Sequence, residues 1–86
     1  MKTRTIEELH DKDIGHRKMA KTVDYLVANG YEVTDIKEYN EQFKFKVNGH
    51  QFWYRKEWKS TAKEFAIYCI NILKTEEEMI RLWSEK

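Results

Sequence analysis

The chain has 86 residues, which is enough for one modest domain and too few for two. Hydrophobic residues make up 41% of it and charged residues 36%, a balance typical of a folded chain rather than a disordered one. A formal net charge of +1 excludes a generally basic protein. The longest near-apolar run, residues 65–73, is too short for a membrane span of about 20 residues, and the first residues lack the apolar segment of a signal peptide. We therefore expect a cytoplasmic protein with no membrane partner.

The first third of the chain carries two signals for the start of a helix. Residues 5–8, TIEE, match a capping box, in which Thr and Glu side chains satisfy free backbone N–H groups. This predicts a short turn from Thr5 to about His10 within an N-terminal segment over 1–13. Asp13 offers a second N-cap, and apolar residues spaced along one stripe predict a helix over about 14–28 that Asn29 and Gly30 end. The residues of this stripe are Met19, Val23, Leu26 and Val27.

The middle of the chain predicts three strands. Residues 31–37, YEVTDIK, favour a strand, but the apolar spacing slips between Val33 and Ile36, so either a bulge or the end of the strand lies there. A polar turn over 38–41 follows. The segment over 42–55, QFKFKVNGHQFWYR, then alternates apolar and polar residues on both sides of Asn48-Gly49. This pair is typical of the type I′ turn of a two-residue β-hairpin.

A two-residue turn also fixes which residues face one another in the hairpin. It places Val47 opposite His50, Phe45 opposite Phe52, and Phe43 opposite Tyr54, all on the face expected to be buried. The other face then carries Gln42, Lys44, Lys46, Gln51, Trp53 and Arg55, with Trp53 directly across from Lys44.

The last third of the chain is helical. Ser60 or Thr61 caps an apolar helix, whose stripe of Ala62, Phe65, Ala66, Cys69 and Leu73 is widened by Ile67, Ile70 and Ile72. Because it lies in this stripe, Cys69 is interpreted as a buried apolar residue, and a single cysteine forms no internal disulfide. A further capping signal over 74–78, KTEEE, predicts a kink or a new helix within 75–86. That extension carries Met79, Ile80, Leu82 and Trp83.

These elements predict a two-layer α+β fold: a helix, a three-stranded antiparallel meander and a second helix over 14–73, followed by the C-terminal helical extension. Both helices cover the apolar face of the sheet. The predicted core consists of Met19, Val23, Leu26, Val27, Val33, Phe43, Phe45, Val47, Phe52, Tyr54, Ala62, Phe65, Ala66, Cys69 and Leu73.

Positive charge is concentrated in the hairpin and the turn that follows it. Residues 42–63 hold six Lys/Arg against one Glu, whereas residues 1–41 hold seven against nine acidic residues and residues 64–86 hold three against five. Such a local excess favours an anionic partner. Trp53 among these cations has three interpretations: it is covered by Met79, Ile80 and Trp83, it lies in a protein interface, or it stacks on a nucleic-acid base.

The segment over 59–63, KSTAK, together with the preceding KVNG turn and Ala66, resembles the junction between the third strand and second helix of the double-stranded-RNA-binding domain. The resemblance covers about residues 17–73 and includes the order of the elements. It implies that Lys59 and Lys63 hold phosphates at the start of the helix. Ser60 stands where that family usually has a second lysine. Taken alone, the residues favour the other interpretation, an N-capped helix start with solvated lysines.

The outer face of the hairpin supports a different comparison. Its Lys44, Lys46, Trp53 and Arg55 are similar in character to the sheet face that small three-strand-plus-helix DNA-binding domains of some integrases insert into the major groove. The two comparisons use different surfaces, so mutations separate them.

Two patterns in the sequence contain residue types found in catalytic sites. Residues 10–16 contain His10, Asp11, Asp13 and His16, but the two histidines are not spaced to share a helix face as a metal pair requires. Asp35 followed by Glu57-Trp58-Lys59 is a bare form of the Asp…Glu-x-Lys pattern of metal-dependent nucleases. Neither pattern has the surrounding elements that such a site needs, so we expect no enzyme, no metal and no cofactor.

The sequence therefore predicts a small nucleic-acid-binding module, monomeric or homodimeric, that uses Lys44, Lys46, Trp53, Arg55, Lys56, Lys59 and Lys63. The alternative is a protein-binding adaptor or inhibitor that uses Trp53 and the acidic residues Glu76, Glu77 and Glu78 of the C-terminal helix.

Overall fold

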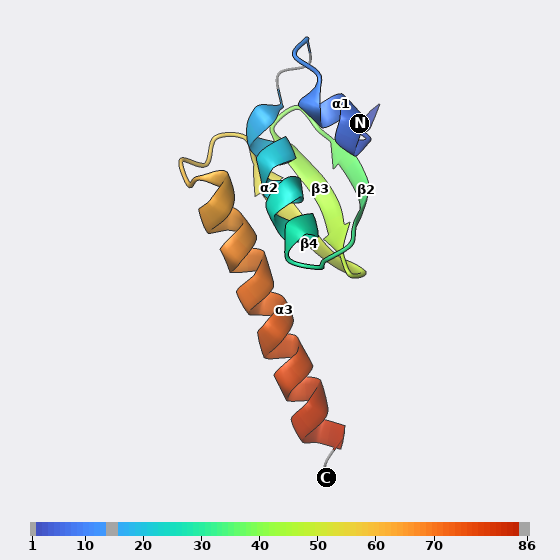
Figure 1. Ribbon diagram of the computed structural model, residues 1–86, viewed down its shortest axis with the longest axis vertical. Helices are drawn as coiled ribbons and strands as arrows, with labels where there is room; N and C mark the ends of the chain where they lie inside the picture. Colours follow the sequence, from blue (N-terminus) through green and yellow to red (C-terminus); the bar gives the residue numbers. More distant parts are fainter. Residues whose placement is uncertain (1, 14–15, 85–86) are drawn as a thin grey trace.

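The computed structural model describes residues 2–13 and 16–84, which form one α+β unit with a sheet and helices in two layers (Figure 1). The predicted fold class is confirmed. In chain order the elements are β1 (Lys2–Thr3), α1 (Ile6–His10), α2 (Arg17–Ala28), β2 (Val33–Glu38), β3 (Gln42–Val47), β4 (His50–Arg55) and α3 (Ala62–Ser84).

The sheet is antiparallel with the strand order β1-β2-β3-β4, so it has one strand more than the predicted meander of three. The added strand β1 pairs Lys2 with Glu38 and Thr3 with Lys37. The backbone N–H of Arg4 then donates to the carbonyl of Ile36 at 2.8 Å. Two residues are too few to show an alternating pattern, which is why the sequence gives no sign of this strand.

The hairpin has the predicted register. Phe45 lies opposite Phe52, and Lys44 lies opposite Trp53. Asn48 and Gly49 have φ values of 50° and 85°, as a type I′ turn requires. The Asn48 side chain also accepts a hydrogen bond of 2.8 Å from the backbone N–H of Glu32, which ties the turn to the residues before β2.

The slip in apolar spacing within β2 is a bulge, because the pairing with β3 shifts between Thr34 and Lys37. Asp35, inside the bulge, adopts a left-handed conformation with φ of 52°. The strand begins at Val33 and continues past its predicted end to Glu38. As a result Ile36 is buried, and Glu38 pairs with Phe43 on the same face as the core.

The first capping box is used as predicted, since the Thr5 hydroxyl accepts the backbone N–H of Glu8 at 3.2 Å at the start of α1. The second helix begins at Arg17 with His16 in the N-cap position and no side-chain cap. The predicted start at Ile14, like Gly15, lies outside the described residues. Asp13 was predicted to cap α2, but its backbone N–H instead donates to the Asp11 carboxylate at 2.9 Å.

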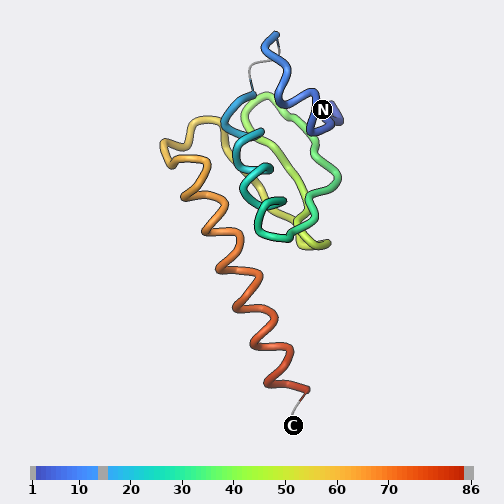
Figure 2. Tube along the Cα trace, in the orientation of Figure 1, coloured from blue at the N-terminus to red at the C-terminus, as the bar shows by residue number. Residues whose placement is uncertain are grey.

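The third helix runs from Ala62 to Ser84 without interruption, so the KTEEE signal starts no new helix. The Thr75 hydroxyl donates to the carbonyl of Asn71 at 2.9 Å within the helix instead of capping one. Its first half packs beside α2, and its last part continues beyond the sheet (Figures 1 and 2). The described chain is therefore elongated, with dimensions of 52 by 23 by 22 Å.

Most of the predicted core is buried, including Phe45, Val47 and Cys69. Val27 is a correction, because it lies at the edge of the stripe centred on Met19, Val23 and Leu26 and is 49% exposed. Ala62 is only half-buried and Ile67 is exposed. The core also contains residues absent from the prediction, namely Leu9, Ala20, Ile36 and Ile70.

Candidate nucleic-acid interface

The outer face of the sheet carries Lys44 and Trp53, opposite the face on which α2 and α3 complete the core. Trp53 is 40% exposed, and its aromatic neighbour is Tyr39, whose ring centroid lies 5.9 Å away. The Lys44 Nζ lies 5.5 Å from the centroid of the Trp53 ring. Trp83, which one hypothesis placed over Trp53, is itself 76% exposed at the far end of α3. Trp53 is thus available to a partner.

Two of the cations predicted on this outer face are already paired. Lys46 Nζ lies 3.5 Å from the Asp35 carboxylate, and Arg55 Nη1 lies 3.4 Å from that of Glu57. Asp35 and Glu57 are the two acidic residues of the nuclease pattern. They lie apart, because their partners Lys46 and Arg55 lie toward opposite ends of the hairpin. The positive charge of this face is therefore weaker than the sequence count indicates.

Lys56 belongs to another part of the molecule. Its Nζ lies 2.7 Å from Oε2 of Glu38 and 5.1 Å from the centroid of the Phe43 ring, on the core side of the sheet. Among the predicted site residues it is the one already bound to a largely buried carboxylate, so the structure separates it from the Trp53 face.

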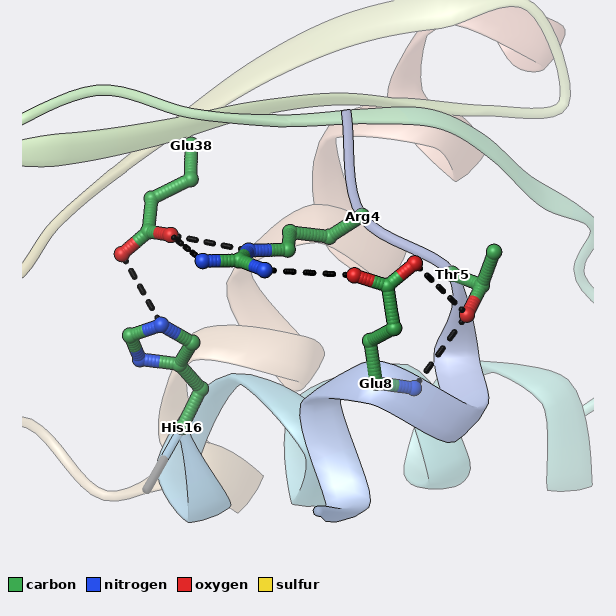
Figure 3. Close-up of polar contacts among 5 residues, drawn as sticks. All are labelled: Arg4, Thr5, Glu8, His16 and Glu38. Carbon is green, nitrogen blue, oxygen red and sulfur yellow. Dashed lines mark hydrogen bonds and ion pairs between the residues drawn. The ribbon is translucent and has the colours of Figure 1, made fainter. Parts of the chain in front are cut away.

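Glu38 is the centre of a polar cluster that we call the Glu38 cluster, formed by Arg4, His16, Glu38 and Lys56. The guanidinium of Arg4 donates twice to Oε1, from Nε at 2.9 Å and from Nη2 at 2.8 Å. His16 Nε2 lies 2.8 Å from Oε2, which also accepts from Lys56. Figure 3 shows Arg4 between Glu38 and Glu8, whose carboxylate lies 3.2 Å from Nη1 of Arg4.

The surroundings of Glu38 favour its ionised form. Burial acts to raise the pKa of Glu38, but the hydrogen bonds from Lys56 and Arg4 and the field of His16 outweigh burial and lower this pKa to about 2. The pKa of His16 is also lowered, mainly because burial disfavours the imidazolium, although the Glu38 carboxylate opposes that shift. A neutral His16 that carries its proton on Nε2 can donate a hydrogen bond to the Glu38 carboxylate.

The Glu38 cluster has a structural role. Both carboxylate oxygens are occupied by protein donors, which leaves little acceptor capacity for a ligand. The donors come from the segment after β1, the start of α2 and the turn after β4, so one side chain joins these parts to β2. The sequence did not reveal this, because Glu38 falls in a polar turn signal and its donors are far apart in the chain.

In the part of the chain that the structure describes, a group of basic residues without a carboxylate partner lies where α2 and α3 begin. Arg17, Lys18 and Lys21 from the first turns of α2 line a surface hollow of about 500 Å³ together with Lys59 and Lys63. We call this the basic hollow; Ser60, Thr61 and Ala62 complete its wall. Lys18 holds the two helix starts together, since its Nζ donates to the carbonyl of Trp58 at 2.7 Å.

The electrostatic character of the basic hollow follows from its neighbours. Within residues 2–13 and 16–84, no ion pair engages any of its five cations. The first turn of α2 contains no acidic residue, whereas that of α3 contains Glu64, and the positive end of each helix dipole adds to the field. The hollow therefore offers a concentrated site for an anion.

Sequence reasoning found only part of this surface. Lys59 and Lys63 were predicted, whereas Arg17, Lys18 and Lys21 were missed because they belong to the segment with negative net charge. Their one available signal was the RKxxK spacing over 17–21, which puts Arg17 and Lys21 on one side of a helix.

The structure does not bring the other candidate metal-binding residues together. His10 Nε2 lies 3.0 Å from Asp24 and His16 faces Glu38, so the two histidines have separate partners. The described residues contain no group of three or more metal-ligand side chains. Cys69 is buried as predicted, and burial raises the pKa of its thiol to about 12.

No family model matches the chain, and no curated protein or solved structure does so. Among the helices of the described residues, none combines the length and the apolar character needed to cross a bilayer.

Proposed function

We propose that the protein binds double-stranded nucleic acid through the basic hollow. The observation that carries this proposal is the convergence of five basic side chains, from two helix starts, with no carboxylate paired to any of them among the described residues. Adjacent cations attract a polyanion and are neutralised by its phosphates.

The chemistry of the hollow favours phosphate contacts over base contacts. Its described lining consists of ammonium, guanidinium, hydroxyl and methyl groups without an aromatic side chain. Trp58, which packs against Tyr54 and Phe65 at ring distances of 6.0 and 5.7 Å, lines a neighbouring hollow instead. A surface of this kind binds the backbone of a duplex without a stacked base. We expect weak sequence preference and a strong dependence on salt.

The resemblance to the double-stranded-RNA-binding domain supports a duplex RNA as the preferred form. It implies phosphate contacts at Lys59 and Lys63, which lie in the basic hollow, and it implies two helices on one face of the sheet. Arg17 and Lys21 extend the same surface onto α2.

The outer sheet face is a secondary surface in this proposal. Lys44 and the half-exposed Trp53 offer one stacking position, which a single strand uses more readily than a duplex. Because Lys46 and Arg55 are already paired with acidic residues, we expect this face to contribute less to duplex binding.

A titration of the protein with labelled duplex RNA, duplex DNA and single strands at about 50 and 200 mM salt tests the proposal. We expect binding to duplex RNA at the lower salt, reduced by at least tenfold at the higher salt. A matched experiment uses Lys59→Ala with Lys63→Ala, which should weaken every duplex. Absence of binding to any oligonucleotide at the lower salt would rule the function out.

The second candidate function is a protein-binding adaptor or inhibitor that uses Trp53 and the acidic residues of α3. The observation that favours it is the exposed apolar surface at the end of α3, where Ile80 is 66% and Trp83 is 76% exposed. Exposed patches of this kind are typical of protein interfaces.

A further inference from the structure

A second surface hollow adjoins the basic hollow and has a different chemistry. Trp58, Ser60, Glu64, Phe65 and Tyr68 line this second hollow, which we call the aromatic hollow. Its volume of about 430 Å³ falls within the range of about 300–1,000 Å³ that is typical of pockets for small ligands. Ser60 also lines the basic hollow, so the two hollows meet just before α3 begins.

Three aromatic rings shape the aromatic hollow. Phe65 is buried, and its ring centroid lies 5.7 Å from that of Trp58 and 6.0 Å from that of Tyr68. Trp58 and Tyr68 are 40% and 55% exposed, so each keeps accessible ring surface beside the buried Phe65. Within residues 2–13 and 16–84, no cation lies over any of these three rings. They are therefore available to stack against a planar ligand.

Trp58 is held in place by contacts on several sides. Its backbone N–H donates to the carbonyl of Arg55 at 3.1 Å, and its own carbonyl accepts the Nζ of Lys18 at 2.7 Å. Its ring meets the ring of Tyr54 edge-on at 6.0 Å. A side chain that is already ordered loses little conformational entropy when a ligand stacks on it. Since Lys18 also lines the basic hollow, its contact with Trp58 fixes the two hollows relative to one another.

Glu64 determines which planar ligand fits best. It is exposed in the first turn of α3, and no ion pair engages its carboxylate among the described residues. A carboxylate beside aromatic rings suits an organic cation, but the five cations of the adjoining basic hollow oppose one. A nucleobase is neutral, stacks through its faces and can donate an amino group to a carboxylate. Its phosphates fit the basic hollow.

We propose that the aromatic hollow binds an unpaired base at the end of a duplex whose phosphates occupy the basic hollow. The inference rests on the proposed function, because the basic hollow must hold the duplex. Bases inside a duplex are already stacked, whereas those at single-stranded ends can stack on aromatic side chains. A duplex with a single-stranded extension therefore binds more tightly than a blunt one. Cytosine is preferred to uracil in the extension, because cytosine offers Glu64 an amino group that uracil lacks.

Fluorescence anisotropy with a blunt duplex RNA, and with the same duplex carrying a short cytosine extension at its 3′ or 5′ ends, tests this inference. We expect the wild type to bind one of the extended duplexes at least about fivefold more tightly than the blunt one. Tyr68→Ala should lose most of this gain and still bind the blunt duplex, because Tyr68 lies outside the basic hollow and is half-exposed. Tyr68→Phe is the matched control, which keeps the ring and should keep the gain.

The carboxylate is tested separately from the rings. Glu64→Gln should bind cytosine and uracil extensions with more similar affinities than the wild type does, because an amide both accepts and donates hydrogen bonds. An undiminished preference for cytosine in Glu64→Gln would contradict the role of this carboxylate.

Equal affinity of the wild type for blunt and extended duplexes would overturn the inference and leave duplex binding by the basic hollow intact. Absence of binding to either duplex would overturn it together with the proposed function. A gain that is lost in Trp53→Ala and kept in Tyr68→Ala would place the unpaired base on the outer sheet face. A saturable response of the free protein to choline chloride, absent with sodium chloride and lost in Tyr68→Ala, would identify the aromatic hollow as a cation site instead.

Discussion

Two groups of basic residues meet at the start of α2 and differ in what surrounds them. His16 belongs to the Glu38 cluster, in which three basic side chains contact one carboxylate. Arg17, the next residue, belongs to the basic hollow, in which none of the five cations has an acidic partner among the described residues. Two consecutive residues therefore have different roles: His16 helps to stabilise the fold, whereas Arg17 is available to a partner.

The difference also predicts opposite effects on stability. Removing the carboxylate from the Glu38 cluster leaves Lys56 without its carboxylate partner and Arg4 with only that of Glu8, which is destabilising. Apart from Lys18, which donates to the carbonyl of Trp58, removing a cation from the basic hollow relieves repulsion between like charges and should leave the fold as stable or slightly more so. Stability and binding are therefore expected to respond to different substitutions.

The largest effect is expected for Glu38→Gln. The amide cannot replace a carboxylate that accepts from Arg4 and Lys56, so the free energy of unfolding should fall by about 2 kcal/mol. Urea denaturation measures this loss. Glu57→Gln is the matched control, because its carboxylate is exposed and forms one surface ion pair, and it should cost less than about 0.5 kcal/mol. Equal losses in both variants would contradict the structural role of the cluster.

Acid should weaken the wild type through the same cluster. The pKa of Glu38 is about 2 in the fold and about 4.5 ordinarily, so the unfolded chain takes up the proton first and stability falls as the pH drops from 4.5 towards 2. The lowered pKa of His16 acts in the same direction below its ordinary value of 6.5. Unfolding free energies measured from pH 7 to 3 should show this decline, and Glu38→Gln should show a shallower one below pH 4.5. Parallel curves for the two proteins would be inconsistent with it.

A smaller effect, on binding alone, is expected from the residues that the sequence did not reveal. Arg17→Ala with Lys21→Ala removes two cations from the basic hollow and should weaken duplex RNA binding about tenfold at low salt. Lys12→Ala with Lys74→Ala removes two exposed lysines elsewhere and should have little effect. Fluorescence anisotropy compares them, and a similar loss for both pairs would show that only net charge matters.

The smallest effect on duplex binding is expected for Trp53→Ala. Because a duplex offers no free base, its affinity should change less than about twofold, while a single strand should lose the stacking contribution of about 1–3 kcal/mol. The same titration with paired and unpaired oligonucleotides checks both. A large loss of affinity for the duplex would indicate that the outer sheet face, and not the basic hollow, is the interface.

The sequence predicted the elements whose signals are local. The Asn48-Gly49 turn determines the hairpin register, and the stripe around Phe65 and Cys69 identifies the core side of α3. It missed features that depend on distant contacts. β1 forms because Lys2 and Thr3 find an open edge of β2, and the bulge at Asp35 sets the side on which Glu38 lies.

The candidate site was predicted in the same partial way. Lys59 and Lys63 stand out in a basic segment, but the other basic residues that line the hollow with them belong to α2, about 40 residues earlier. Lys56 looked equivalent to them in sequence, yet it contacts Glu38. Whether a lysine is free or paired depends on the packing of strands and helices, which residue spacing does not encode.

The most direct test of the central claim compares the salt dependence of duplex RNA binding in two matched variants. Lys59→Ala with Lys63→Ala and Lys44→Ala with Lys46→Ala each remove two lysines, from the basic hollow and from the outer sheet face. If the hollow holds the phosphates, the log–log slope should fall by about two units for the first pair and remain near the wild-type value for the second. A fall confined to the second pair, or an equal fall in both, would contradict the proposal.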